Sequence, residues 1–221
     1  MKYLLTALLT ILTLPCAFAQ VNDKIDIDYN KVEVNVLTNR QHYQDQLQRY
    51  IAADTTMRLD EIALVYYGYP STLEYDPTID YSTIRDQFAK KEYKKVLEQV
   101  REALPADPVN LDLIVMGALS ASKVNSKADA AYLANLQNRF NMLVTAIMAS
   151  GSGVDVNSPF KIIRAADAMV LMRNVIGITD ITNDAQADNI MAYVFRLPQS
   201  QRDNILYFDI TPQQKFLSSP Q

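Results

Sequence analysis

The sequence predicts a mainly α protein, built from antiparallel helix pairs and ending in a small C-terminal β-hairpin. Three observations support this fold class. Apolar residues recur at helical spacing through most of the chain after residue 38, glycine and proline separate the periodic segments, and two runs rich in β-branched and aromatic residues lie near the C-terminus. With 221 residues, of which 49% are apolar and 21% charged, the chain has the size and composition of one globular domain.

Residues 1–19 have the features of a secretory signal peptide. Lys2 precedes an apolar run over residues 3–14, and Ala17-Phe18-Ala19 matches a small-x-small cleavage site. The run is shorter than the roughly 20 apolar residues of a transmembrane helix, and Pro15 stands where a lipid-modified Cys16 would need a small residue. We therefore expect an exported protein, periplasmic or secreted, whose mature chain has no cysteine and no transmembrane segment.

The mature chain is predicted to begin with an N-terminal arm over residues 20–37. A short strand is expected around residues 32–36 of this arm, where valine alternates with polar residues. A single domain over residues 38–221 follows. Its first elements are two helices and an irregular loop that contains glycine and proline, expected over residues 39–51, about 59–67 and 68–80.

The strongest helical periodicity lies in the middle of the chain. The predicted helices cover residues 82–104, with a turn at 90–92, then 111–124 and 132–147. Gly151 and Gly153 are expected to end this series, since glycine commonly follows the last turn of a helix.

The last third of the domain is predicted to change from helix to sheet. Ser158-Pro159 supplies a cap and a first-turn proline for a helix that ends near Asn174. Residues 189–197 and 204–210 are then expected to pair as the two strands of an antiparallel hairpin at about 188–210.

Residues 91–110 resemble the second half of a tetratricopeptide repeat. The matching positions are an aromatic residue, an aliphatic residue, an Ala-Leu pair and an Asp-Pro-x-Asn turn, here Tyr93, Leu97, Ala103, Leu104, Asp107, Pro108 and Asn110. The next segment fits a second unit less closely, so the resemblance covers about one and a half repeats. Ala103 is expected to be buried at a close helix crossing, where a larger side chain would destabilise the fold.

A second resemblance covers most of the mature chain. It rests on five segments, Asp54-Thr55-Thr56, Val65-Tyr66-Tyr67-Gly68-Tyr69, Tyr75-Asp76-Pro77, Ser150-Gly151-Ser152-Gly153 and Ile205-Leu206-Tyr207-Phe208-Asp209-Ile210. In these segments the chain resembles the DUF4919 family of exported, uncharacterised proteins from Bacteroides-type bacteria. The resemblance implies a tetratricopeptide-like fold, an exported location and no known activity, and it supplies no catalytic residues.

Charge and residue types argue against several functional classes. The net charge of −4 disfavours nucleic acid as a partner. His42 is the only histidine, so a catalytic triad or a histidine metal site lacks its other members. Asp26-x-Asp28-x-Asn30 begins like a calcium loop, but Lys31 and Leu37 replace the glycine and glutamate that such a loop needs. We therefore predict no enzyme activity, no catalytic residue, no metal and no cofactor.

The tyrosines are the one compositional feature that points to binding. Thirteen of the 20 aromatic residues are tyrosine, and five of them fall between Tyr66 and Tyr81. Tyrosine suits stacking on sugars and contact with peptides, which makes Tyr66, Tyr67, Tyr69 and Tyr75 candidate ligand-binding residues. The alternative is that these rings fill the join between the N-terminal helices and the repeat-like helices.

Two functions follow from these observations. The first is a non-enzymatic module of the bacterial cell envelope that binds a protein or peptide partner, because stacked helix pairs form grooves that hold extended peptides or helices. The second is a carbohydrate-binding or carbohydrate-processing accessory protein that uses the tyrosines between Tyr66 and Tyr81.

Overall fold

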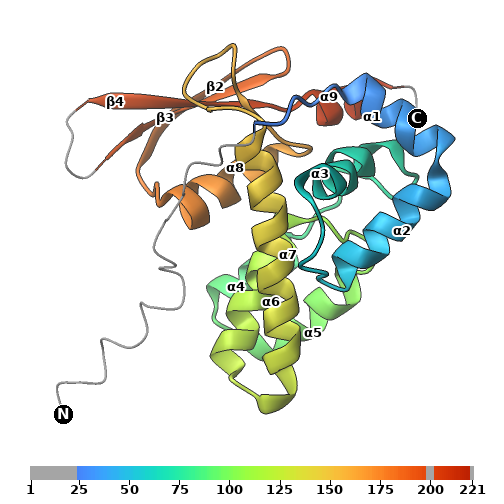
Figure 1. Cartoon of the computed structure of the whole chain (residues 1–221). Coiled ribbons are helices and arrows are strands. Elements are labelled where there is room, and N and C mark those ends of the chain that lie inside the picture. Colours follow the sequence, from blue (N-terminus) through green and yellow to red (C-terminus); the bar gives the residue numbers. More distant parts are fainter. Residues whose placement is uncertain (1–23, 198–201, 220–221) are drawn as a thin grey trace.

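The computed structural model describes residues 24–197 and 202–219, which form a helical body with a small sheet at one end (Figure 1). The helices are α1 (Tyr29–Thr38), α2 (Arg40–Ile51), α3 (Leu59–Gly68), α4 (Ser82–Ala89), α5 (Tyr93–Ala103), α6 (Leu111–Val124), α7 (Ala130–Ala149), α8 (Ala165–Leu171) and α9 (Thr211–Ser218). The strands are β1 (Phe160–Lys161), β2 (Ile181–Ala187), β3 (Ile190–Arg196) and β4 (Asp203–Asp209). A mainly helical fold with a small C-terminal sheet is therefore confirmed. The predicted signal peptide and residues 198–201 of the hairpin loop lie outside the described residues.

Helix α1 replaces the predicted arm and its short strand. The side chain of Asp28 caps the helix, because its Oδ1 accepts hydrogen bonds from the backbone N–H groups of Asn30 and Lys31, both at 3.1 Å. Val32 and Val36, one helical turn apart, both pack against the core. The strand prediction was wrong because valines spaced by two also place every second one on a single helix face.

Helices α2 and α3 agree with the sequence prediction. Tyr43 and Tyr50 of α2 are buried, as expected for the apolar face of that helix. The three N-terminal helices approach closely at Gly68, the last residue of α3. A Cβ atom on Gly68 would lie 2.7 Å from Val36 Cγ2 and 2.9 Å from Tyr43 Cε2. Glycine is therefore required where α3 crosses α1 and α2.

Helices α4 to α7 follow the predicted periodicity. The predicted turn separates α4 from α5, with Lys91 in the left-handed region at φ +61°. Helix α5 packs on α6 and α6 packs on α7 (Figure 1). Ala103 is partly buried at the end of α5, so its expected full burial was wrong. The close crossing lies instead at Gly117 of α6, where a Cβ atom would lie 2.9 Å from both Val100 Cγ1 and Leu136 Cδ1.

The predicted helix over residues 158–174 is shorter than expected. Its first part is extended, because β1 pairs in parallel with β4 and the N–H of Ile162 donates to the carbonyl of Asp209 at 2.9 Å. Phe160 and Ile163 are also buried, so this stretch is apolar on both sides like an interior strand. Helix α8 begins only at Ala165. A proline at the first helical position and helical spacing of apolar residues were therefore insufficient to identify a helix here.

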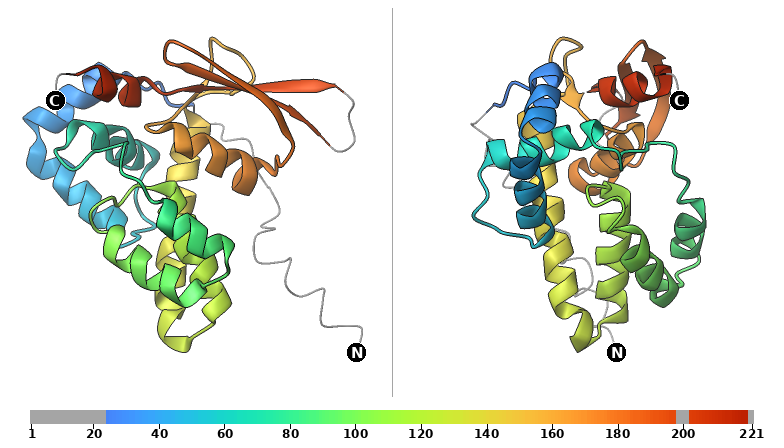
Figure 2. Two further views of the ribbon diagram at one scale, coloured as in Figure 1. Left: turned by 180° about the vertical axis from the view of Figure 1, so that it is seen from behind. Right: turned by 90° about the vertical axis from the view of Figure 1, so that its right-hand side faces the viewer.

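The sheet has the order β1-β4-β3-β2. The predicted hairpin is confirmed as the antiparallel pair β3 and β4, and β1 and β2 extend it on either side. Its inner face buries Tyr193, Phe195, Leu206 and Phe208. In both views of Figure 2 the sheet lies at the same end of the molecule as α1 and α9. Helix α9 contacts the core through Phe216, whose ring lies 5.6 Å from that of Tyr75.

Candidate functional site

The structure places the four candidate tyrosines in the interior. Tyr66, Tyr67, Tyr69 and Tyr75 have exposed fractions of 0%, 2%, 1% and 3%. Their rings form edge-to-face contacts, with centroids 4.9 Å apart for Tyr66 and Tyr67 and 6.0 Å apart for Tyr69 and Tyr75. A ring that stacks on a sugar must expose one face. In this conformation these four rings offer no such face.

The hydroxyl groups of these tyrosines are used within the chain. Tyr67 donates to the carbonyl of Lys161 at 3.0 Å, and Tyr75 donates to that of Ile163 at 2.5 Å. Tyr66 donates to Oδ2 of Asp167 at 2.6 Å. These bonds connect α3 and the loop after it to the segment that contains β1 and the start of α8. The tyrosine cluster therefore joins the N-terminal helices to the C-terminal part of the domain.

A buried charged group lies beside the tyrosines. Arg164 Nη2 lies 2.5 Å from Asp107 Oδ1, and the two side chains are 6% and 2% exposed. The guanidinium carbon of Arg164 is 5.6 Å and 5.4 Å from the ring centroids of Tyr69 and Tyr75. Burial raises the pKa of the Asp167 carboxyl to about 7, although Arg164 acts in the opposite direction. The sequence pointed to Asp107 only as a turn residue, and its ion pair with Arg164 spans 57 residues.

The described residues contain no group suited to hold a metal ion. Within residues 24–197 and 202–219, no three histidine, cysteine, aspartate or glutamate side chains come close enough to do so. The buried charged group formed by Asp107, Arg164 and Asp167 also contains no serine, cysteine or histidine nucleophile. Arg164 bonds to Asp107, and the two carboxyl groups accept further bonds from Asn110 and Tyr66. Its geometry supports a structural role that fixes the segment before α8 to the helical body.

The outer edge of the sheet is exposed to solvent and accessible to a partner. Strand β2 pairs only with β3 in the described part of the chain, and six of its seven residues are exposed. Ala187 and Ile190 flank a two-residue turn and pair with each other. Residues in that position exchange backbone hydrogen bonds, and the pattern then alternates along the strand. The backbone groups of Asp184 and Gln186 therefore point away from the sheet. The N–H of Asp184 donates to Asn183 Oδ1 at 3.0 Å, so Gln186 provides the outward N–H that is open to a partner.

The face of the sheet opposite the core is apolar and partly open. The register aligns Ala185 with Ala192 and Tyr207, and it aligns Val194 with Ile205, which is 40% exposed. All five residues are partly or fully exposed. An ion pair between Arg196 and Asp203, 2.7 Å apart, lies at the end of this face. An open backbone edge and an apolar face thus meet at β2, and we define this combination as the β2 edge surface.

Comparison with known proteins places the chain in a family. The family described as a domain of unknown function, DUF4919, matches residues 30–218, which run from α1 to α9. The chain belongs to the DUF4919 family. No curated protein matches it. No solved structure matches it either.

The DUF4919 match includes both the helical body and the β2 edge surface, so the two are parts of one family domain. In the described residues of this DUF4919 domain, no helix has both the length and the apolar character needed to span a membrane. The sequence did not predict β2, because its residues Ile-Thr-Asn-Asp-Ala-Gln-Ala contain only two with a clear preference for strands. The Asp188-Asn189 pair between β2 and β3 was the one available turn signal.

Proposed function

We propose that this protein is a non-enzymatic module that binds a protein or peptide partner through the β2 edge surface. The observation that carries this proposal is the open edge of β2, where outward-pointing backbone groups adjoin an apolar face. An extended peptide can add to such an edge as a further strand, with main-chain hydrogen bonds that provide affinity and side-chain contacts that provide specificity. Natural proteins commonly protect exposed edges with charged residues, proline, β-bulges or a covering element. The β2 strand contains neither lysine nor proline. Its register shift lies at one end, between Ile181 and Asn183, and its one charged residue is Asp184, so residues 185–187 form a regular, uncharged edge.

The helical body serves as a rigid support for this surface. The buried Arg164–Asp107 pair and the tyrosine hydroxyl bonds fix the C-terminal segment to the helices. We further propose that helices α4 to α7 pack as tetratricopeptide-like pairs, on the basis of the motif at residues 91–110. The proposed setting is the envelope of a Bacteroides-type bacterium, and its support is the signal-peptide pattern of residues 1–19.

The carbohydrate-binding alternative has less support. Its motive was the tyrosine cluster, and the four candidate rings are buried. Tyr81 is partly exposed, but its hydroxyl lies 3.5 Å from Asp107 Oδ2 and belongs to the buried charged group. Binding to a glycan panel that is lost in a folded Tyr67→Ala or Tyr69→Ala variant would favour this alternative over the peptide-binding proposal.

Site-specific photo-crosslinking tests the proposal. A photoreactive phenylalanine analogue replaces Ala185, which lies in β2 and is exposed, and a second protein carries it in place of Glu98, which is exposed on α5. Each protein is irradiated in an envelope extract of a Bacteroides-type bacterium. We expect a discrete crosslinked protein from position 185 and none from position 98.

A proline variant distinguishes strand addition from nonspecific binding to the exposed surface. Gln186→Pro removes an N–H that points away from the sheet and leaves the bonds between β2 and β3 in place, which an edge strand tolerates. Gln186→Thr keeps the N–H and is the matched control. We expect the crosslink to persist with Thr and disappear with Pro. A crosslink that is equally strong from both positions, or unaffected by Gln186→Pro, would refute the proposed function.

A further inference from the structure

The charged residues of β2 and of the segments directly before and after it are all acidic. The fourteen residues 177–190 contain Asp180, Asp184 and Asp188 and no lysine or arginine, and all three aspartates are exposed. The backbone N–H of Arg196 bonds to Asp180, and its side chain pairs with Asp203. No ion pair in the described residues involves Asp184 or Asp188. The edge that is open to a further strand therefore carries uncompensated negative charge.

The two kinds of surface lie on opposite sides of β2. Asp184 pairs across the ladder with Tyr193, whose side chain is buried on the inner face. Ala185 pairs with Ala192, on the outer apolar face. Successive side chains of a strand point to opposite faces, so an added strand would meet a carboxylate on one side and apolar groups on the other. Both faces of β2 are exposed, which leaves space for the side chains of such a strand.

We infer that the partner of the β2 edge surface is an extended peptide segment that alternates basic and apolar residues. This inference rests on the proposed function and specifies the chemistry of the partner. Basic residues of the segment would lie opposite Asp184 and continue toward Asp188, since opposite charges on facing strand positions attract. Its apolar residues would extend the face formed by Ala185, Ala192 and Val194.

A second copy of the chain fits this edge less well. Pairing β2 with β2 of another copy would bring six carboxylates into one ribbon, three from each chain, without a basic residue in either segment 177–190. Like charges on neighbouring strands are destabilising. The same carboxylates would favour a basic segment, so the charge pattern selects a different partner over self-association.

Peptide binding tests this inference directly. The probe is a fluorescein-labelled peptide of nine residues that alternates lysine and valine, and the comparison peptide replaces each lysine with glutamate. Fluorescence anisotropy is measured with the full mature chain in low-salt buffer. We expect the Lys-Val peptide to bind at least about tenfold more tightly than the Glu-Val peptide, as expected for several facing charges.

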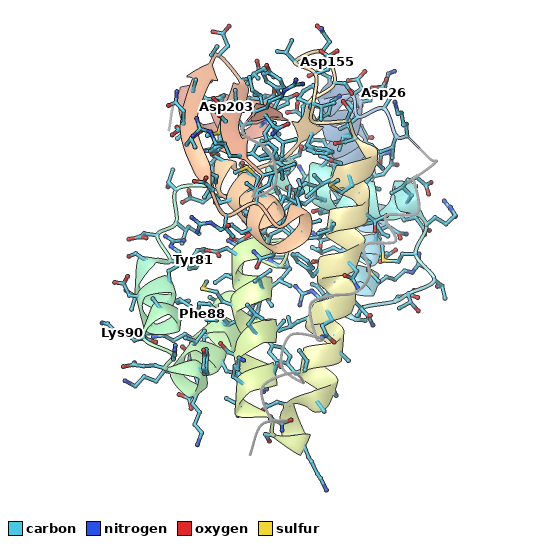
Figure 3. The ribbon with its side chains drawn as sticks, turned by 90° about the vertical axis from the view of Figure 1, so that its left-hand side faces the viewer. Asp26, Tyr81, Phe88, Lys90, Asp155 and Asp203 are labelled. Carbon is cyan, nitrogen blue, oxygen red and sulfur yellow. The ribbon has the colours of Figure 1, made fainter. Side chains whose placement is uncertain are left out.

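Matched variants assign the charge effect to β2. Asp184→Asn with Asp188→Asn removes two negative charges at the edge, and Glu98→Gln with Glu102→Gln removes two from the exposed face of α5. Figure 1 places α5 at the end of the body away from β2, and Figure 3 likewise places Lys90, before α5, far from Asp203 of β4. We expect a rise in Kd of roughly three- to tenfold for the first variant and less than about twofold for the second.

Each outcome supports or overturns the inference. Loss of Lys-Val binding in Gln186→Pro, with retention in Gln186→Thr, supports a strand added at β2. Equal affinity for the Lys-Val and Glu-Val peptides, both lost in Gln186→Pro, overturns the charge inference and leaves the proposed function standing. Equal loss in the β2 and α5 charge variants, no binding of either peptide, or binding that survives Gln186→Pro also overturns the inference. The crosslinking experiment tests the proposed function separately from the charge inference.

Discussion

Breaking the buried ion pair between Asp107 and Arg164 is expected to destabilise the whole domain. Asp107→Asn keeps the size of the side chain, and Asn110 Nδ2, which bonds to Asp107 Oδ2 at 2.8 Å, keeps an acceptor. The substitution removes the charge that faces Arg164. The guanidinium would then be buried beside the Tyr69 and Tyr75 rings, with Nη1 lacking a hydrogen-bond partner. Asp167 would be the remaining carboxyl that interacts with it.

The expected loss in the free energy of unfolding follows from the burial of both partners. Because the two side chains are 6% and 2% exposed, water cannot replace the missing partner. Removing one member of a buried pair costs about 3–5 kcal/mol, whereas replacing both with uncharged groups can cost much less. We therefore expect about 3–5 kcal/mol of destabilisation for Asp107→Asn and for Arg164→Met. The double variant should lose at least about 2 kcal/mol less than the sum of the single losses.

Urea unfolding followed by far-ultraviolet circular dichroism measures these values, since the body is helical and the chain has no tryptophan. The wild type, the two single variants and the double variant form a complete double-mutant cycle. If each single variant stays within about 1 kcal/mol of wild type, or if the two losses simply add, then Arg164 and Asp107 do not form the buried pair described here.

Three further predictions concern packing and pH. Gly117→Val, which forces a Cβ to 2.9 Å from Val100 and Leu136, should cost about 1–3 kcal/mol in urea unfolding. Ala103→Leu should cost less, because Ala103 is only partly buried, and the reverse order would contradict the assigned crossing. Burial raises the pKa of Asp167 to about 7, so its proton stabilises the fold below about pH 4, and this stabilisation is lost as the pH rises through 7. Asp167→Asn should flatten that part of the stability profile, and an unchanged slope would count against the raised pKa.

The helical body could be predicted because its helices are amphipathic or continuously apolar. Leu111–Val124 was predicted with the bounds that α6 has, since Asn110 caps its start through a bond to the N–H of Leu113 and Asn125 ends it in the left-handed region. Such signals are local. They depend on neighbouring residues and do not require contacts with distant parts of the chain.

The misassigned segments depend on distant partners. Phe160 is extended because β4, almost fifty residues later, offers it a hydrogen-bonding edge, with Phe160 paired to Phe208. The tyrosines are a similar case. Sequence spacing identified Tyr66 and Tyr75 as unusual, but their burial depends on Asp167 and on the carbonyl of Ile163. No pattern within residues 66–81 distinguishes a core cluster from a surface cluster.

The β2 edge surface could not be predicted for a different reason. Strand β2 is polar and exposed, and it forms a strand because β3 supplies a partner across a tight turn at Asp188-Asn189. Asp188 adopts a φ of +51° there, which aspartate tolerates better than most residues. An edge strand with little apolar content leaves no periodic signal. Identifying the β2 edge surface therefore requires the order and register of the strands, which the sequence alone does not provide.

Amide hydrogen exchange in β2 tests strand addition most directly. In the free protein the N–H of Gln186 should exchange rapidly, because it points away from the sheet, and those of Ala185 and Ala187 should be protected by β3. The N–H of Asp184 is a poorer reporter, because it donates to Asn183 Oδ1. With the Lys-Val peptide bound, nuclear magnetic resonance should show that exchange slows at Gln186 and stays unchanged at Ala185. Unchanged exchange at Gln186 in the saturated complex, or slowing confined to the helical body, would contradict a partner strand at the β2 edge.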